Sequence, residues 1–167
     1  GYKFITYRLS PNTNPEAKSN RLDYIYEDKY NTIWILSYDK QAYRFDPQTE
    51  IFTGVRSLEY YKDKEFYTSQ IITAKSGKIW LLSEDSGCIC VTDSTFKAEI
   101  FNTRNKNLTD DFVTTIYEDK KRNSWILTKK GLTFLSPNHE QKLFYFHPKS
   151  DTPYENCEPF FDALEFE

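Results

Sequence analysis

Apolar residues in this chain fall into short runs separated by turn-forming residues. The runs Leu22–Glu27 and Ile33–Ser37 flank a turn at 28–31, where Asp and Asn tolerate positive φ and hydrogen-bond locally. Two further runs, Ala42–Phe45 and Glu50–Val55, are separated by an Asp-Pro turn. Runs this short, bounded by such turns, predict four antiparallel strands.

The same pattern recurs along the chain. Tryptophans at positions 34, 80 and 125 are spaced 46 and 45 residues apart, and each opens a run of apolar residues that ends in Ser or Thr. An isoleucine stands nine residues before each tryptophan, at Ile25, Ile71 and Ile116. The chain is therefore built from a repeat of about 45 residues.

Four short antiparallel strands in each repeat are typical of a β-propeller blade. A two-sheet sandwich also has short strands, but its strands have no reason to recur at a fixed period. We therefore predict an all-β fold, a fragment of a β-propeller of about three four-stranded antiparallel blades. The expected blades are residues 20–55, 66–104 and 110–148, with the outer strand of a preceding blade at 1–9 and the first strand of a following blade at 156–167.

The repeat resembles the two-component regulator propeller repeat, which runs Ile-x-Glu-Asp, a turn, Trp-Ile-Gly-Thr, Gly-Leu and an aromatic-Asp ending. The first copy carries Ile25, Glu27, Asp28, Trp34, Ile35, Phe45 and Asp46, and the third carries Ile116, Glu118, Asp119, Trp125, Ile126, Thr128, Gly131 and Leu132. Leucine replaces the glycine after Trp-Ile in all copies, at Leu36, Leu82 and Leu127. The second copy has Thr73-Ala74 in place of Glu-Asp.

In that family the repeats usually form the periplasmic sensor of hybrid two-component systems of gut bacteria. The resemblance therefore implies a periplasmic segment of a receptor anchored in the inner membrane. It also implies recognition of an oligosaccharide and relay to a histidine kinase outside this chain.

Composition supports the β prediction and excludes several functions. Among 167 residues, 17% are aromatic and none is Met, a balance that favours strands over helices. A net charge of −3 argues against nucleic-acid binding, which usually needs a basic surface. No apolar run has the length of about 20 residues needed to cross a bilayer, so we expect this segment not to contact a membrane.

The three cysteines leave the redox compartment open. Cys88 and Cys90 would point to the same face of one strand, a poor geometry for a bridge between them. They are either small buried hydrophobes or one of them pairs with Cys157.

No set of residues suggests catalysis, a cofactor or a metal site. The only histidines, His139 and His147, lie outside the repeated core and in no metal-ligand spacing. The acidic pairs 27/28 and 118/119 could be read as general acid and base. Their position at a turn instead predicts that Asp28 and Asp119 accept backbone N–H bonds, and we expect no enzyme activity.

The repeated position of Trp34, Trp80 and Trp125 at the start of the second strand predicts that they pack between blades rather than stack on sugars.

Alternating strand direction places the links between second and third strands on the same rim as the connections between blades. Aromatic and charged side chains there suit the ring faces and hydroxyls of a sugar. The candidate ligand-binding residues on this rim are Tyr38, Asp39, Lys40, Tyr60, Tyr61, Glu84, Asp85, Lys129 and Lys130.

An alternative function is a protein-interaction or dimerisation scaffold without a small-molecule site. An open arc of blades exposes strand edges and apolar flanks, which recruit other chains. We therefore expect a homo-oligomer that forms through the open propeller edges, with the segment at 2–9 or that at 159–165 completing a sheet.

Overall fold

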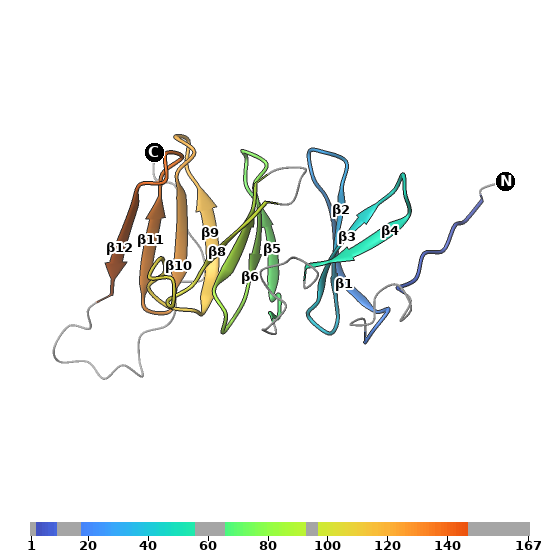
Figure 1. The fold of residues 1–167 in the computed structure, drawn as a ribbon, viewed down its shortest axis with the longest axis horizontal. Coiled ribbons are helices and arrows are strands. Elements are labelled where there is room, and N and C mark those ends of the chain that lie inside the picture. The colour runs from blue at the N-terminus through green and yellow to red at the C-terminus, as the bar shows by residue number, and fades with distance from the viewer. Residues whose placement is uncertain (1–2, 10–17, 56–65, 93–96, 147–167) are drawn as a thin grey trace. The chain divides into compact units, whose positions relative to one another are not determined.

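A computed structural model describes residues 3–9, 18–55, 66–92 and 97–146. Its described residues form three separate four-stranded antiparallel sheets (Figure 1). The first contains β1 (Leu22–Glu27), β2 (Ile33–Ser37), β3 (Ala42–Asp46) and β4 (Ile51–Gly54). The second contains β5 (Gln70–Thr73), β6 (Ile79–Leu82), β7 (Cys88–Val91) and β8 (Ala98–Phe101). The third contains β9 (Val113–Glu118), β10 (Ser124–Thr128), β11 (Gly131–Leu135) and β12 (Gln141–Tyr145).

The predicted fold class is confirmed, because each sheet pairs its strands in sequence order, as a propeller blade does. Residues 3–9 form no strand in the described part of the chain, so the outer strand expected at 1–9 stays a prediction. The strand expected at 156–167 lies outside the described residues.

The repeat extends to irregularities of the sheets. The register between β1 and β2 shifts between Leu22 and Tyr24, and that between β10 and β9 shifts between Leu127 and Thr128. In both sheets the extra residue of the first strand, Asp23 or Thr114, stands eleven positions before the tryptophan. A β-bulge of this kind bends and twists a strand.

The chain divides into two compact units, residues 1–68 with the first sheet and residues 69–167 with the other two. In the first unit, Ile35, Tyr43 and Phe45 form a small core together with Leu9. Tyr7 lies on the same side, with its ring 4.8 Å from that of Phe45.

In the second unit a larger core joins the two sheets. One face of the second sheet contributes Trp80, Leu82, Cys88 and Cys90, and β9–β11 contribute a facing set of apolar side chains: Val113, Ile116, Ile126 and Leu135. Strands β6 and β9 pack against each other in this unit. Trp80 therefore lies between two blades, as a residue that holds them together.

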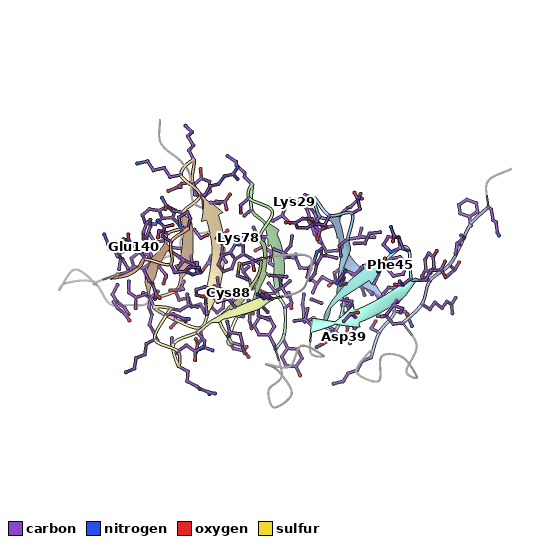
Figure 2. All side chains as sticks on the ribbon, turned by 45° about the horizontal axis from the view of Figure 1, so that its top comes forward. Lys29, Asp39, Phe45, Lys78, Cys88 and Glu140 are labelled. Carbon is purple, nitrogen blue, oxygen red and sulfur yellow. The ribbon has the colours of Figure 1, made fainter. Side chains whose placement is uncertain are left out.

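Each blade has two opposite rims. The β1–β2 and β3–β4 turns lie at one end of the first sheet, and the β2–β3 turn lies at the other, so Lys29 and Asp39 lie at opposite ends (Figure 2). In each blade, we call the end with the turn between the second and third strands (β2–β3, β6–β7 or β10–β11) its second-turn rim. The opposite end of each blade, with the β1–β2, β5–β6 or β9–β10 turn, is its first-turn rim.

Candidate functional site

The first turn of the first and third blades is organised by one aspartate. Asp28 Oδ1 accepts the backbone N–H groups of Tyr30 at 2.8 Å and Thr32 at 3.0 Å, while its Oδ2 accepts the indole N–H of Trp34 at 2.9 Å. Asp119 repeats this arrangement with Lys121, Asn123 and Trp125. The carboxylate thus fixes both the turn and the indole that follows it.

The pKa of Asp119 reflects this role. Burial by itself raises it, but hydrogen bonds from Asn123 and Trp125 outweigh that effect and lower the pKa below its usual range. This carboxylate is therefore ionised and fully engaged in structure, which leaves it unsuited to proton transfer.

The second blade has the same turn without the aspartate. Its backbone bonds are the same, with Ala74 N donating to Lys78 O at 2.9 Å and Gly77 N to Ala74 O at 2.8 Å. The carboxylate that caps this turn comes from the neighbouring blade, because Ser76 N donates to Glu118 Oε1 at 2.8 Å. Glu118 therefore links the first-turn rims of two blades.

Glu118 is buried and held by two more contacts. Ser76 Oγ donates to its Oε2, and Arg122 contacts its Oε1 at 3.0 Å. Burial raises the pKa of this carboxyl, but the hydrogen bonds from Ser76 and Arg122 outweigh it, and the pKa lies below the usual value. The sequence predicted no part for Glu118 beyond its turn, because its partner Ser76 lies 42 residues earlier.

On the second-turn rim, the first blade presents Tyr38, Asp39 and Lys40 in one link. Tyr38 is 55% exposed, and the guanidinium of Arg21 lies 4.2 Å from its ring centroid. Asp39 accepts hydrogen bonds from Ser37 Oγ and, at 3.1 Å, from Lys18 N.

Lys40 has a positive φ of 62°, and its ammonium lies 3.7 Å from the carboxylate of Asp23. Its carbonyl oxygen accepts the backbone N–H of Thr68 at 2.8 Å, so the connection that follows the first blade reaches this link. Tyr60 and Tyr61, the candidate ligand-binding residues in that connection, lie outside the described residues.

In the second blade, Glu84 and Asp85 are exposed. Asp85 Oδ1 accepts the hydroxyls of Ser83 at 3.0 Å and Ser86 at 2.7 Å, so this carboxylate, like Asp39, braces its own turn.

In the third blade, the ammonium of Lys129 lies 3.7 Å from the ring centroid of Phe112. That of Lys130 lies 2.8 Å from a carboxylate oxygen of Asp110.

Both links of the second unit meet the connection between β8 and β9. Gly87 N donates to Asp111 O at 2.8 Å, and Lys129 N donates to Phe112 O at 3.2 Å. Asp110, Asp111 and Phe112 therefore belong to this rim, although sequence reasoning did not select them. The only sequence signal for them is their place in a connection between blades.

Two cysteines of the second unit lie in its apolar core. Cys88 and Cys90 are buried free thiols, and burial raises the pKa of Cys90 to about 12. Cys157 lies outside the described residues. Within the described ranges, no group of three or more His, Cys, Asp and Glu side chains could hold a metal ion. Those residues also include no helix long and apolar enough to span a bilayer.

Two pockets of the second unit open near the first-turn rim. One, of about 370 Å³, has Lys78, Cys90, Glu99 and His139 among its lining residues. The other, of about 140 Å³, lies beside Ala74, Trp80 and Glu118.

Neither the protein-family models nor the curated proteins give a match to this sequence. Among solved structures, the chain is similar to the extracellular domain assigned to the hybrid two-component system BT3049 of B. thetaiotaomicron. That match has 21% identity and a TM-score of 0.55, and covers 84% of this chain and 19% of that one. The extracellular domain assigned to the one-component system BT4673 of the same organism matches with 22% identity and a TM-score of 0.52, over 77% of this chain and 19% of that one.

Virginiamycin B lyase from Staphylococcus aureus matches with 15% identity and a TM-score of 0.56, over 89% of this chain and 45% of the lyase. The chain thus spans about a fifth of the two extracellular domains and under half of the lyase. Because proteins of different function share this fold, the likeness shows the fold alone. These comparisons establish that the chain consists of β-propeller blades.

Proposed function

We propose that this chain is part of the periplasmic sensor domain of a hybrid two-component regulatory system, and that it helps to recognise a glycan fragment. The observation that carries the proposal is that the sequence repeat and the fold point to the same kind of protein. The repeat resembles the two-component regulator propeller repeat, and the fold is similar to the extracellular domain assigned to BT3049. Relay to a histidine kinase would take place outside this chain.

Recognition rather than catalysis fits the state of the acidic pair at 118 and 119. Glu118 accepts from Ser76 and Arg122, and Asp119 accepts from its turn and from Trp125. Because these oxygens already hold structural donors, the pair is poorly placed to exchange protons with a substrate.

In this proposal the second-turn rim of each blade is ligand-facing. One repeat position, four residues after the tryptophan, is exposed in all three blades and is occupied by Tyr38, Glu84 and Lys129. In the second unit, Glu84 and Lys129 offer an acceptor and a donor for the hydroxyls of a sugar, and in the first unit Tyr38 offers an aromatic ring for a sugar face. The next position in the first two blades is occupied by Asp39 and Asp85. Their carboxylates accept hydrogen bonds within their own turns and so stabilise them.

The test is calorimetric titration of the complete extracellular domain with oligosaccharides selected on a glycan array. We expect Tyr38→Ala and Lys129→Ala to weaken binding of a selected oligosaccharide at least about tenfold. The matched control is Lys121→Ala, an exposed lysine on the opposite rim, which should leave affinity unchanged. Equal affinity of all three variants and the unmodified domain would contradict the assignment of this rim.

A second candidate, a protein-interaction scaffold, is favoured by one observation. Ile25 is 64% exposed, whereas Ile71 and Ile116 at the same repeat position are each 7% exposed. The apolar face of β1 is therefore uncovered, as an interaction surface would be. A domain that binds no oligosaccharide on the array but associates through this face would support the scaffold over the sensor.

A further inference from the structure

The indole of Trp80 lacks the acceptor that its two counterparts have. Trp80 is fully buried, and its Nε1–H has no hydrogen-bond partner among the described residues. In the other blades this group donates to the aspartate six residues earlier, at 2.9 Å for Trp34 and 3.1 Å for Trp125. The corresponding residue here is Ala74, whose methyl group accepts nothing. A buried N–H left unpaired is unfavourable, so this site favours an external acceptor.

The two backbone N–H groups of the same turn have other acceptors in place of the aspartate. Ser76 N donates to Glu118 Oε1 at 2.8 Å, and Lys78 N lies 3.5 Å from Ser76 Oγ. In the first and third blades the corresponding backbone groups use one aspartate oxygen, while the indole uses the other. Of these three donors in the second blade, the indole N–H of Trp80 is therefore the one left without a partner among the described residues. Its counterparts in the other blades donate to the second carboxylate oxygen of the aspartate.

A small pocket borders this turn and the Trp80 side chain. It has a volume of about 140 Å³, and both Ala74 and Trp80 line it. Ile72 and Ile116 add apolar walls, and Lys75 and Glu118 add one charge of each sign. Ala74 occupies the place where the other blades carry a carboxylate, and the pocket that borders it has room for a molecule of a few non-hydrogen atoms.

The chemistry of the occupant follows from the repeat and from the charges. Twice in this chain the same indole donates to a carboxylate oxygen. The oxygens of Glu118 already accept from Ser76 and Arg122, which offsets their negative charge. Lys75 supplies a positive charge at the pocket wall. An anionic acceptor is therefore accommodated next to Trp80.

We propose that this pocket binds a small carboxylate of the size of formate or acetate, one oxygen of which accepts the Trp80 Nε1–H. The ligand takes the place of the aspartate side chain that the second blade lacks. The site lies on the first-turn rim, between β5–β6 and β9, and it stands whether or not the opposite rim binds a glycan.

The test observes the indole directly. The three tryptophans give three indole N–H cross-peaks in a ¹⁵N–¹H correlation spectrum of the whole chain, assigned with Trp34→Phe and Trp125→Phe. Addition of sodium acetate should shift the Trp80 cross-peak along a saturating curve and leave the other two in place. Sodium chloride at equal ionic strength should move none of them.

Two variants with side chains of similar size distinguish the effect of adding a hydrogen-bond acceptor from the effect of filling the pocket. Ala74→Asp supplies an internal carboxylate, so its Trp80 cross-peak should move towards those of Trp34 and Trp125 and no longer respond to acetate. Ala74→Leu fills the pocket without an acceptor, so its cross-peak should lose the response without that move. A Trp80 cross-peak that ignores acetate in the unmodified chain, or moves together with the other two, overturns the proposal. A response retained in Ala74→Leu also overturns it, even where Ala74→Asp fails to fold.

Discussion

At the scale of single residues, one carboxylate can organise a whole blade edge. Asp28 is only 8% exposed, yet it meets two backbone N–H groups and the indole of the fully buried Trp34. Charge-assisted hydrogen bonds of this kind are stronger than neutral ones, and three of them share a single anion. The turn and the adjacent core therefore depend on the same side chain.

Replacement of Asp28 by Ala should lower the free energy of unfolding by about 1–3 kcal/mol, because buried donors lose their acceptor. Urea unfolding followed by tryptophan fluorescence measures this change. The matched control is Glu27→Ala, which removes an exposed carboxylate one position earlier and should stay within about 0.5 kcal/mol of the unmodified chain. Equal losses for the two variants would show that the hydrogen bonds of Asp28 contribute nothing specific.

Replacement of Trp80 tests whether the tryptophans stabilise the fold by packing. It is fully buried, and its ring centroid lies 5.4 Å from that of Phe101. Trp80→Ala should cost about 3–5 kcal/mol, the usual loss for a deleted buried aromatic. The half-buried Trp125 is the comparison, and Trp125→Ala should cost less. A melting temperature unchanged by Trp80→Ala would point instead to a role in ligand stacking.

At the scale of elements, the turn between β6 and β7 requires a glycine. Gly87 has a φ of +81°, and a Cβ atom there would lie 2.0 Å from the carbonyl oxygen of Phe101. A side chain would therefore both strain the turn and push β8 away from β7.

Gly87→Ala should destabilise the second unit severely, with loss of folded protein on expression and early loss of hydrogen-exchange protection in β7 and β8. Gly54→Ala is the control, since a Cβ there would make ordinary contacts of 3.5 Å with Tyr43. That variant should change the free energy of unfolding by less than about 1 kcal/mol. Similar behaviour of the two variants would refute the close approach at Gly87.

The contact of Glu118 with the β5–β6 turn should make stability depend on pH. Its pKa in the folded chain lies below its usual range, so the ionised form is stabilised by folding. That contribution is present above the unfolded pKa of about 4.3 and is lost as the pH falls through the folded pKa.

Glu118→Gln should therefore be less stable than the unmodified chain near neutral pH, and the difference should shrink as the pH falls below about 4.3. Urea unfolding in carboxylate-free buffers at several pH values measures this difference. Other carboxylates contribute equally to both proteins and cancel. A difference that stays constant with pH would mean that the charge of Glu118 does not act through this contact.

The repeat explains which parts of the fold and the site the sequence could predict. Strand positions and the role of Asp28 follow from local pattern, because short apolar runs and turn chemistry each depend on a few neighbouring residues. The contact between Ser76 and Glu118 joins residues 42 positions apart and depends on how two blades pack. The loss of Asp at Ala74 is visible in the sequence, but the orphaned indole and the pocket beside it are visible only in three dimensions.

At the scale of the whole molecule, each unit exposes apolar side chains on an edge strand of a sheet. On β1, Leu22 and Tyr24 are each 48% exposed and Ile25 is 64% exposed. At the end of the third sheet, Phe144 and Tyr145 are 47% and 52% exposed. Water contact with such groups is unfavourable, and edge strands offer unpaired backbone groups as well.

We therefore expect this chain to self-associate at micromolar concentration, most simply as a symmetric pair. Light scattering measures the mass, and a dimer would have twice the 19.9 kDa of one chain. Two variants locate the contact: Ile25→Asp should weaken a pair formed through β1, and Phe144→Asp a pair formed through β12. Both positions are exposed, so neither substitution places a charge in a core. A monomer of 19.9 kDa at all concentrations, with both terminal segments protected from proteolysis, would refute association through these edges.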